Sequence, residues 1–276
     1  MFAERLAEAV ERTGPLCAGI DPSADLLAEW GMPDDATGLR SFSRRCLEAF
    51  ADVVPVVKVQ VAFFERHGAA GFAVLEELIA ESRRVGLLVI GDAKRGDIVT
   101  TAEAYADAWL DGSSPLAVDA VTATPYVGPD ALMPLVTAAR RHGRGVLVVV
   151  RSSNPDGRPL QEAVTAAGVA VEDLLLGRIA AWNGEEQAAT GSVGAVLGAT
   201  LGPSAFPLSQ LRGVVLAPGL GAQGATPADV AVRFAGCPPG TLLPNASRSV
   251  LAAGPSVEAL RAAAVGVRDA LAAALL

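Results

Sequence analysis

The sequence alternates between short apolar runs and longer helical patterns, and this alternation limits the folds that the chain can form. The apolar runs are rich in Val, Leu, Ile and Ala, which is typical of strands buried on both faces of a sheet. Stretches with apolar residues at helical spacing separate these runs. We predict eight strands, at residues 16–20, 56–61, 87–90, 120–123, 145–150, 193–199, 213–216 and 242–245.

Eight strand–helix alternations predict an all-parallel sheet with helices outside it. That number favours a closed (β/α)8 barrel, a TIM barrel, over an open doubly wound sheet. The length of 276 residues is common for such a barrel, and no low-complexity linker divides the chain, so we expect a single domain over residues 1–276. Helices are expected at residues 1–12, 39–54, 69–85, 99–110, 129–141, 160–182, 205–211, 227–234 and 256–276.

The composition argues against several classes of protein. The net charge is −8 and no basic stripe is present, so a nucleic-acid groove is not expected. No uninterrupted apolar stretch of 18 residues suggests a membrane span. The cysteines at positions 17, 46 and 237 have neither disulfide-type nor metal-type spacing, which favours a reducing cytoplasm. With only His67 and His142, a histidine-rich metal centre is excluded.

Three charges of alternating sign follow the buried strand predicted at residues 87–90. They are Asp92, Lys94 and Asp97. Buried charges persist only when paired or hydrogen-bonded, and such clusters often mark active sites. Asp92 and Lys94 are two residues apart and should face the same side of an extended chain, where Lys58 of the neighbouring strand can meet them. We therefore expect an alternating array of lysines and aspartates, the alternative being a solvated loop.

The remaining polar residues at predicted strand ends suggest the rest of a site, because a barrel carries its active site at the carboxyl ends of its strands. Strands seven and eight commonly bind phosphate there. Here a Gly-rich turn with Gln223 follows strand seven, and Arg248 follows strand eight. Backbone N–H groups, an amide and a guanidinium together suit a phosphate dianion. Read in isolation, the glycines, Asp21 and Ser153 are also ordinary turn formers.

These motifs resemble those of one known family. Residues 92–97, Asp-Ala-Lys-Arg-Gly-Asp, match the Asp-x-Lys-x-x-Asp motif of the orotidine 5′-phosphate decarboxylases. Further matches follow in the family's order: Gly-Ile-Asp-Pro at 19–22, Lys-Val-Gln at 58–60, Ser-Asn-Pro at 153–155, Pro-Gly-Leu-Gly-Ala-Gln-Gly at 218–224 and Arg-Ser at 248–249. The resemblance covers nearly the whole chain and is strongest to the longer bacterial branch. Asp156 before Gly157, and Ser247 where a glycine is common, are departures from the pattern.

The resemblance implies that the chain decarboxylates orotidine 5′-monophosphate to UMP and CO2, the last step of de novo pyrimidine biosynthesis, without a cofactor or metal. It implies that Lys94 donates the proton to carbon 6 and that Asp92 lies near the departing carboxylate. Lys58 and Asp97 would hold the array, and Asp21 with Lys58 would contact the ribose hydroxyls.

The same resemblance assigns the rest of the substrate and a partner subunit. Ser153 would hydrogen-bond the pyrimidine, Pro218 would line the substrate site, and Gln223 and Arg248 would bind the phosphate. Asp97 and Thr101 would reach the site of the neighbouring subunit in a homodimer with two shared sites.

Two other functions stay open at this point. One is a sugar-phosphate aldolase or a metal-dependent decarboxylase of the same superfamily; Lys58 opposes the metal enzyme, because relatives of that kind carry an acidic ligand at this strand position. The other is a non-catalytic nucleotide-binding barrel, which would need no lysine–aspartate array.

The segment at 157–189 is interpreted as either an enlarged lid or a longer barrel helix.

Overall fold

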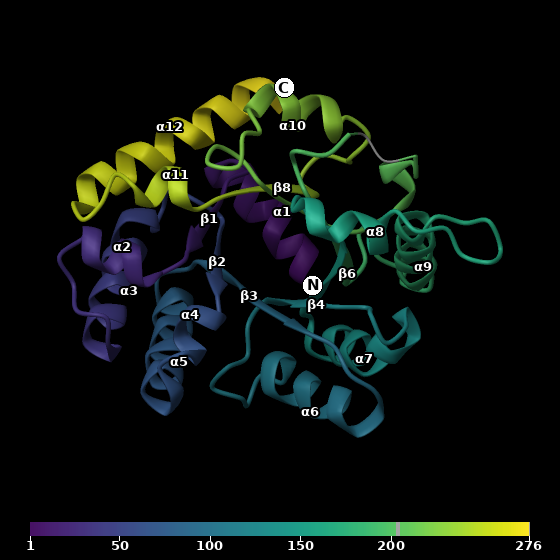
Figure 1. The fold of residues 1–276 in the computed structure, drawn as a ribbon, viewed down its shortest axis with the longest axis horizontal. Coiled ribbons are helices and arrows are strands. Elements are labelled where there is room, and N and C mark those ends of the chain that lie inside the picture. The colour runs from purple at the N-terminus through teal and green to yellow at the C-terminus, as the bar shows by residue number, and fades with distance from the viewer. Residues whose placement is uncertain (203–204, 276) are drawn as a thin grey trace.

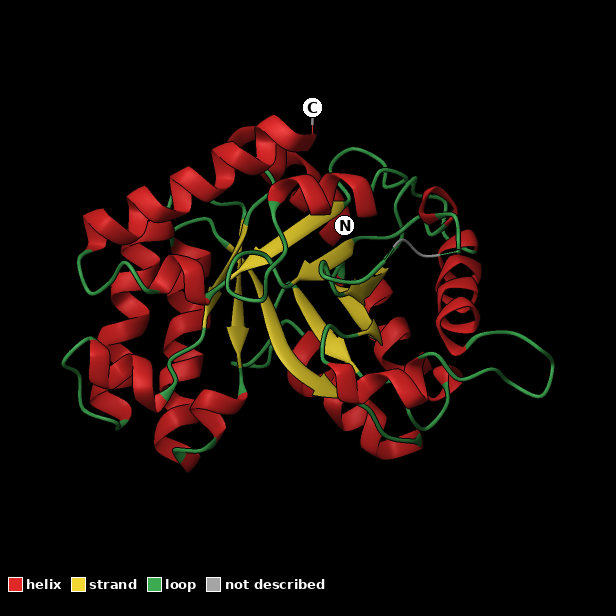
Figure 2. Ribbon diagram, turned by 45° about the horizontal axis from the view of Figure 1, so that its top comes forward, coloured by secondary structure: helices red, strands yellow, loops and turns green. Residues whose placement is uncertain are grey.

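Eight parallel strands close into a barrel at the centre of the molecule (Figure 2, yellow). The structure, a computed structural model, describes residues 1–202 and 205–275. Each strand pairs with the next along the chain, and β8 returns to pair with β1. The (β/α)8 architecture predicted from the sequence is confirmed. The strands are β1 (Cys17–Ile20), β2 (Val56–Gln60), β3 (Leu88–Arg95), β4 (Ala120–Ala123), β5 (Gly145–Arg151), β6 (Val193–Leu197), β7 (Val215–Pro218) and β8 (Leu242–Ala246).

Helices surround the barrel (Figure 1). They bury apolar side chains against the outer face of the strands. They are α1 (Phe2–Thr13), α2 (Ala24–Glu29), α3 (Ala36–Phe50), α4 (Ala62–Glu65), α5 (Gly68–Arg84), α6 (Val99–Leu110), α7 (Met133–His142), α8 (Arg158–Gln161), α9 (Val171–Gly184), α10 (Pro227–Arg233), α11 (Arg248–Leu251) and α12 (Val257–Leu275). Short 3₁₀ turns lie at Pro129–Leu132, Pro155–Gly157 and Leu208–Gln210. None of the helices in the described part of the chain is both long and apolar enough to span a membrane.

The opening helix α1 closes the end of the barrel at which the strands begin. Its Phe2 and Leu6 side chains pack with Leu147 and other residues of the barrel interior. Arg5 of the same helix donates from Nη1 to Asp119 Oδ1 at 2.6 Å, just before β4. The carboxyl ends of the strands are therefore left as the open end of the barrel, where a site can form.

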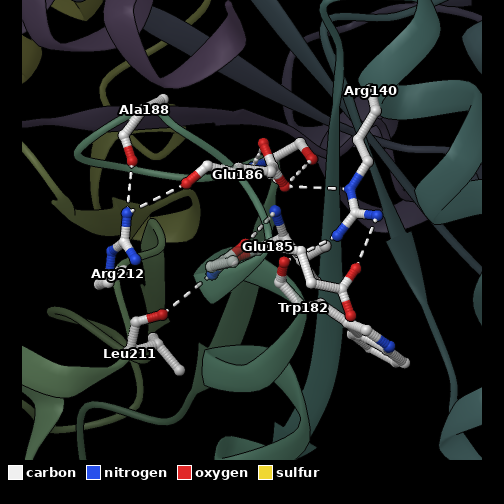
Figure 3. Close-up of polar contacts among 10 residues, drawn as sticks. Arg140, Trp182, Glu185, Glu186, Ala188, Leu211 and Arg212 are labelled. Carbon is white, nitrogen blue, oxygen red and sulfur yellow. Dashed lines mark hydrogen bonds and ion pairs between the residues drawn. The ribbon is translucent and has the colours of Figure 1, made fainter.

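The connection from α9 to β6 is fixed by a network at the same closed end (Figure 3). Arg140 of α7 donates to the carboxylate of Glu186 at 3.2 Å and to the carbonyl oxygen of Trp182 at 2.7 Å. Arg212 donates to the carbonyl oxygen of Ala188 at 2.7 Å. These hydrogen bonds hold the segment between α9 and β6 in place at the closed end of the barrel.

The helix predicted over residues 160–182 is wrong in its first half. The chain forms only the short α8 and then an arm before α9 begins at Val171. In this arm one isolated bridge joins Val164 to Ala170, and Thr165 N donates to the carbonyl oxygen of Val169 at 2.8 Å. Gly168 takes a left-handed φ of 78° at the tip of the arm, and β-branched residues flank the turn. The arm projects away from the barrel (Figure 2), so residues 157–189 do not form one long helix.

Smaller boundary differences have local causes. The strand predicted to end at residue 90 continues to Arg95, because Asp92 still pairs with β2 and Arg95 pairs with β4. The helix predicted at 39–54 is α3, which begins at Ala36 because Asp35 caps it by accepting from the N–H groups of Thr37 and Gly38. The helix predicted at 205–211 is only a 3₁₀ turn, and the one at 129–141 begins as a 3₁₀ turn. The last helix is confirmed up to Leu275, and residue 276 lies outside the described residues.

Candidate active site

A pocket of about 230 Å³ opens at the carboxyl ends of the strands. Eight of the ten site residues predicted from the sequence line it: Asp21, Lys58, Asp92, Lys94, Ser153, Pro218, Gln223 and Arg248. These residues come from segments more than 200 positions apart in the chain, and the barrel brings them together because its parallel strands end on the same side.

Asp92 is at the centre of the polar contacts in this pocket. Its Oδ2 accepts from Lys58 Nζ at 3.0 Å and from Gln60 Nε2 at 3.1 Å. Its Oδ1 accepts from Lys94 Nζ at 2.6 Å and from Thr122 Oγ1 at 2.9 Å. With four donors on two oxygens, the carboxylate of Asp92 is held in one orientation.

Burial and charge act against each other in this array. Asp92 is 8% exposed and Lys58 is 5% exposed. Burial lowers the pKa of Lys58, but the carboxylates of Asp21 and Asp92 outweigh this effect and raise that pKa above its ordinary value. Burial likewise raises the pKa of Asp92, but Lys58 and Lys94 outweigh it and hold that pKa well below its ordinary value. Both groups are therefore charged around neutral pH.

Lys94 has an unusual backbone for a residue with a side chain. Its φ is 48°, in the left-handed region. Its N–H donates to Thr122 Oγ1 at 2.9 Å, and its carbonyl oxygen accepts from Thr124 Oγ1 at 3.2 Å. Strained conformations of this kind persist where the surroundings impose them, and they cluster at functional sites. The Lys94 side chain as a whole is half exposed, so it remains in contact with solvent.

Asp21 faces the same array from β1. Its Oδ1 is buried without a hydrogen-bond partner and lies 3.8 Å from Lys58 Nζ. A buried acceptor that lacks a hydrogen bond is free to receive a donor from a bound ligand.

The opposite wall of the pocket is formed by loops that follow β5, β7 and β8. Gly219 and Gly221 have φ values of 116° and 74°, and a Cβ on Gly221 would lie 2.7 Å from Ser249 Oγ, so this turn requires glycine at that position. Ser153 Oγ donates to Gln223 Oε1 at 2.7 Å and joins two of the loops. Arg248 lines the pocket beside them and is exposed.

Two of the predicted residues are not brought to this pocket. Asp97 accepts from the N–H of Ile98 at 2.8 Å in the loop after β3, and Thr101 is exposed on α6. Both lie outside the residues that line the pocket of their own chain.

Sequence reasoning missed several residues that line the pocket and gave no role to Gln60. Thr122 of β4 and Asn245 of β8 line the pocket, and Gln60 was noted only within a motif. A single polar residue within an apolar strand was the available signal for Thr122. Within residues 1–202 and 205–275, no group of three or more His, Cys, Asp or Glu side chains is arranged to hold a metal ion.

The fold and the pocket define a (β/α)8-barrel protein with a lysine–aspartate array at the carboxyl ends of its strands. Residues 14–263 match the sequence profile described as "Orotidine 5'-phosphate decarboxylase / HUMPS family". The chain belongs to this family.

Relatives and solved structures agree with this assignment. Orotidine 5'-phosphate decarboxylase of Corynebacterium efficiens is 51% identical over 265 residues, which cover 95% of this chain and 94% of the relative. The enzyme of that name from Streptomyces coelicolor is 51% identical over 264 residues, with the same coverage. A crystal structure of a protein assigned as orotidine 5'-phosphate decarboxylase from Streptomyces avermitilis superposes with a TM-score of 0.92 at 48% identity, covering 99% of this chain and 95% of that one.

Proposed function

We propose that this chain decarboxylates orotidine 5′-monophosphate to UMP and CO2, the last step of de novo pyrimidine biosynthesis, without a cofactor. The observation that carries the proposal is the array of Lys58, Asp92 and Lys94 in the pocket, in a chain half identical to relatives with this name. A non-catalytic nucleotide-binding barrel would need a phosphate site but no such array.

The array suits the chemistry of this reaction. When the bond from carbon 6 to the carboxylate breaks, its electron pair stays on carbon 6 and CO2 leaves. An ammonium close to that carbon stabilises the developing charge and then transfers a proton to it. Lys94 is the proposed donor, because its Nζ is fixed 2.6 Å from Asp92 while its side chain remains in contact with solvent. Solvent returns the proton to the lysine after each turnover.

Asp92 is proposed to lie beside the substrate carboxylate. Four donors fix it in place, and its lowered pKa keeps it charged. Repulsion between two carboxylates is relieved when one of them leaves as CO2. Lys58 compensates the charge of Asp92 and keeps the pair stable in a nearly dry site.

The remaining contacts are assigned to the parts of the nucleotide that do not react. Asp21 and Lys58 are proposed to bind ribose hydroxyls, and the unpaired buried oxygen of Asp21 supports this. Ser153 is proposed to bind the pyrimidine, and Pro218 to line the site. Gln223 and Arg248 are proposed to bind the phosphate. Since Ser153 and Gln223 already share a hydrogen bond, phosphate binding would order both loops over the ring.

We also propose a homodimer in which Asp97 and Thr101 reach the neighbouring site. Two large apolar side chains that follow Asp97 directly in the chain are exposed: Ile98 at 55% and Val99 at 67%. Exposed apolar side chains of this size are typical of a surface that another chain covers. We further propose that residues 1–276 act as one domain in the cytoplasm, which is supported by the single closed sheet and by the free cysteines.

The test is an ultraviolet assay of orotidine 5′-monophosphate loss in buffer with a chelator. Substrate-dependent loss with formation of UMP is expected. An activity that requires an added divalent metal, or trapping of Lys94 by borohydride with a sugar phosphate, would instead support the metal-dependent decarboxylase or the aldolase.

A further inference from the structure

Thr122 links the two charged residues at the centre of the pocket through a single hydroxyl. It is the polar residue of β4 and is 1% exposed. Its Oγ1 donates to Asp92 Oδ1 at 2.9 Å and accepts from the backbone N–H of Lys94 at 2.9 Å. Because Lys94 Nζ bonds the same Asp92 oxygen, at 2.6 Å, the three residues form a closed ring of hydrogen bonds.

The backbone of Lys94 needs such a support. The pairing of β3 with β4 is irregular between Gly91 and Arg95, and Lys94 lies inside this interval with its left-handed φ of 48°. The hydroxyl of Thr122 accepts from the Lys94 N–H where the regular ladder is interrupted. Without that acceptor, the N–H of Lys94 would lose the hydrogen bond that supports its strained conformation.

Thr122 is well suited to fix an orientation. A β-branched side chain has few χ1 rotamers, and β4 is paired on both sides, with β3 and β5. The Lys94 side chain is long and half exposed, and its ammonium is held by Asp92 Oδ1, the same oxygen that accepts from Thr122.

We infer that Thr122 is a positioning residue that orients the Lys94 ammonium and the Asp92 carboxylate for the reaction. The inference rests on the proposed function. Thr122 acts through its two partners, so its loss affects the chemical step more than the binding of the nucleotide, whose phosphate is held on the far side of the pocket.

The test compares Thr122→Val, which removes the hydroxyl at nearly constant volume, with Thr122→Ser, which keeps it. Thr241→Val is the matched control: Thr241 is also buried and its Oγ1 donates to the carbonyl oxygen of Pro238 at 2.7 Å, but it lies where β8 begins. The measurements are kcat, KM, the Kd of UMP and the melting temperature.

We expect Thr122→Val to lower kcat by roughly 10- to 100-fold, because small errors of position at a reacting centre have effects of that size. KM and the Kd of UMP should change by less than about 3-fold, as expected for an interaction that matters in the transition state. Thr122→Ser should recover most of the loss, and Thr241→Val should leave kcat and KM near the wild-type values. A purely structural role would lower the melting temperature without this separation of kcat from KM.

The inference is overturned if Thr122→Val keeps the wild-type kcat, if Thr122→Ser is no better than Thr122→Val, or if KM alone rises. Should Thr122→Val fail to fold, Thr122→Ala takes its place, and an Ala variant as active as the Ser variant overturns the inference. A wild-type chain that is inactive on orotidine 5′-monophosphate overturns the proposed function and this inference with it, whereas an unaltered Thr122→Val overturns the inference alone.

Discussion

The ammonium of Lys58 lies 3.0 Å from Asp92 Oδ2, and both side chains are almost completely removed from solvent. A buried ion pair is not in itself a large source of stability, because desolvation offsets much of the attraction. Removal of either member destabilises the fold, however, because the other is then a buried charge that has lost an opposite charge beside it. This dependence allows the array to be tested through stability as well as through activity.

Replacing Lys58 with Met should destabilise the protein because it leaves the Asp92 carboxylate short of positive charge. Removing one partner of a buried pair typically costs about 3 kcal/mol or more. The free energy of unfolding, measured in urea, should fall by this order in Lys58→Met. The double variant Lys58→Met with Asp92→Leu should regain part of the loss, and a double variant less stable than the single one would contradict the pairing.

The array also predicts how stability depends on pH. The folded pKa of Asp92 is lowered, so its contribution is present above the unfolded value of about 4 and is lost as the pH falls toward the folded value. The folded pKa of Lys58 is raised, so its contribution is present below the unfolded value of about 10.4 and is lost as the pH rises toward the folded value.

Wild type should have a larger free energy of unfolding than Asp92→Asn. The difference between the two should be constant from about pH 5 to pH 9 and should shrink at lower pH. Urea titrations across this range measure it. A stability difference between the two proteins that grows as the pH falls below 4 would contradict the assignment.

Arg248→Ala should raise KM for the nucleotide strongly, because it removes a charge-assisted hydrogen bond to the phosphate. A bond of that kind contributes about 1.5–3 kcal/mol, which corresponds to roughly 10- to 100-fold in KM. Turnover should fall as well if phosphate binding orders the loops. Arg84→Ala, at an exposed arginine paired with Glu81 on α5, is the control. An unchanged KM in Arg248→Ala would contradict the phosphate assignment.

Shared sites in a homodimer can be tested by mixing two inactive proteins. Lys94→Ala should disable the site of its own chain, and Asp97→Asn should disable the site of its partner. In a mixed dimer one site then carries both changes and the other carries neither. After random exchange of subunits, activity should return to about one quarter of the wild-type value. No recovery, in a mixture whose exchange is verified by mass, would exclude the sharing of Asp97.

The sequence predicted the barrel because strands buried on both faces are continuous apolar runs, and each such run became a strand. It misjudged the arm before α9, where helical spacing of apolar residues competes with a glycine and β-branched residues that favour a turn. It also ended β3 too early. The apolar run ends at Ile90, but pairing of Arg95 with Ala123, a contact distant in sequence, continues the strand beyond the irregular pairing between Gly91 and Arg95.

Part of the site could also be predicted, because the pattern of strands determines which residues lie at the strand ends. Lys58, Asp92 and Lys94 were expected to lie close together, because they stand at the ends of neighbouring strands and alternate residues of a strand face the same side. The hydrogen bonds of Asp92 with both lysines confirm this. Thr122 was not found, since threonine is common in strands and its role depends on the irregular pairing of β3 with β4. Asp97 and Thr101 stay predictions, because their proposed function depends on a second chain.

The most direct test of the account is the turnover of orotidine 5′-monophosphate by Lys94→Ala, followed by release of CO2 from substrate labelled in the carboxylate, with UMP binding measured on the same protein. The account predicts no measurable release beyond the background while UMP still binds. Substantial residual release from a protein that binds UMP normally would contradict the assignment of Lys94 as the proton donor.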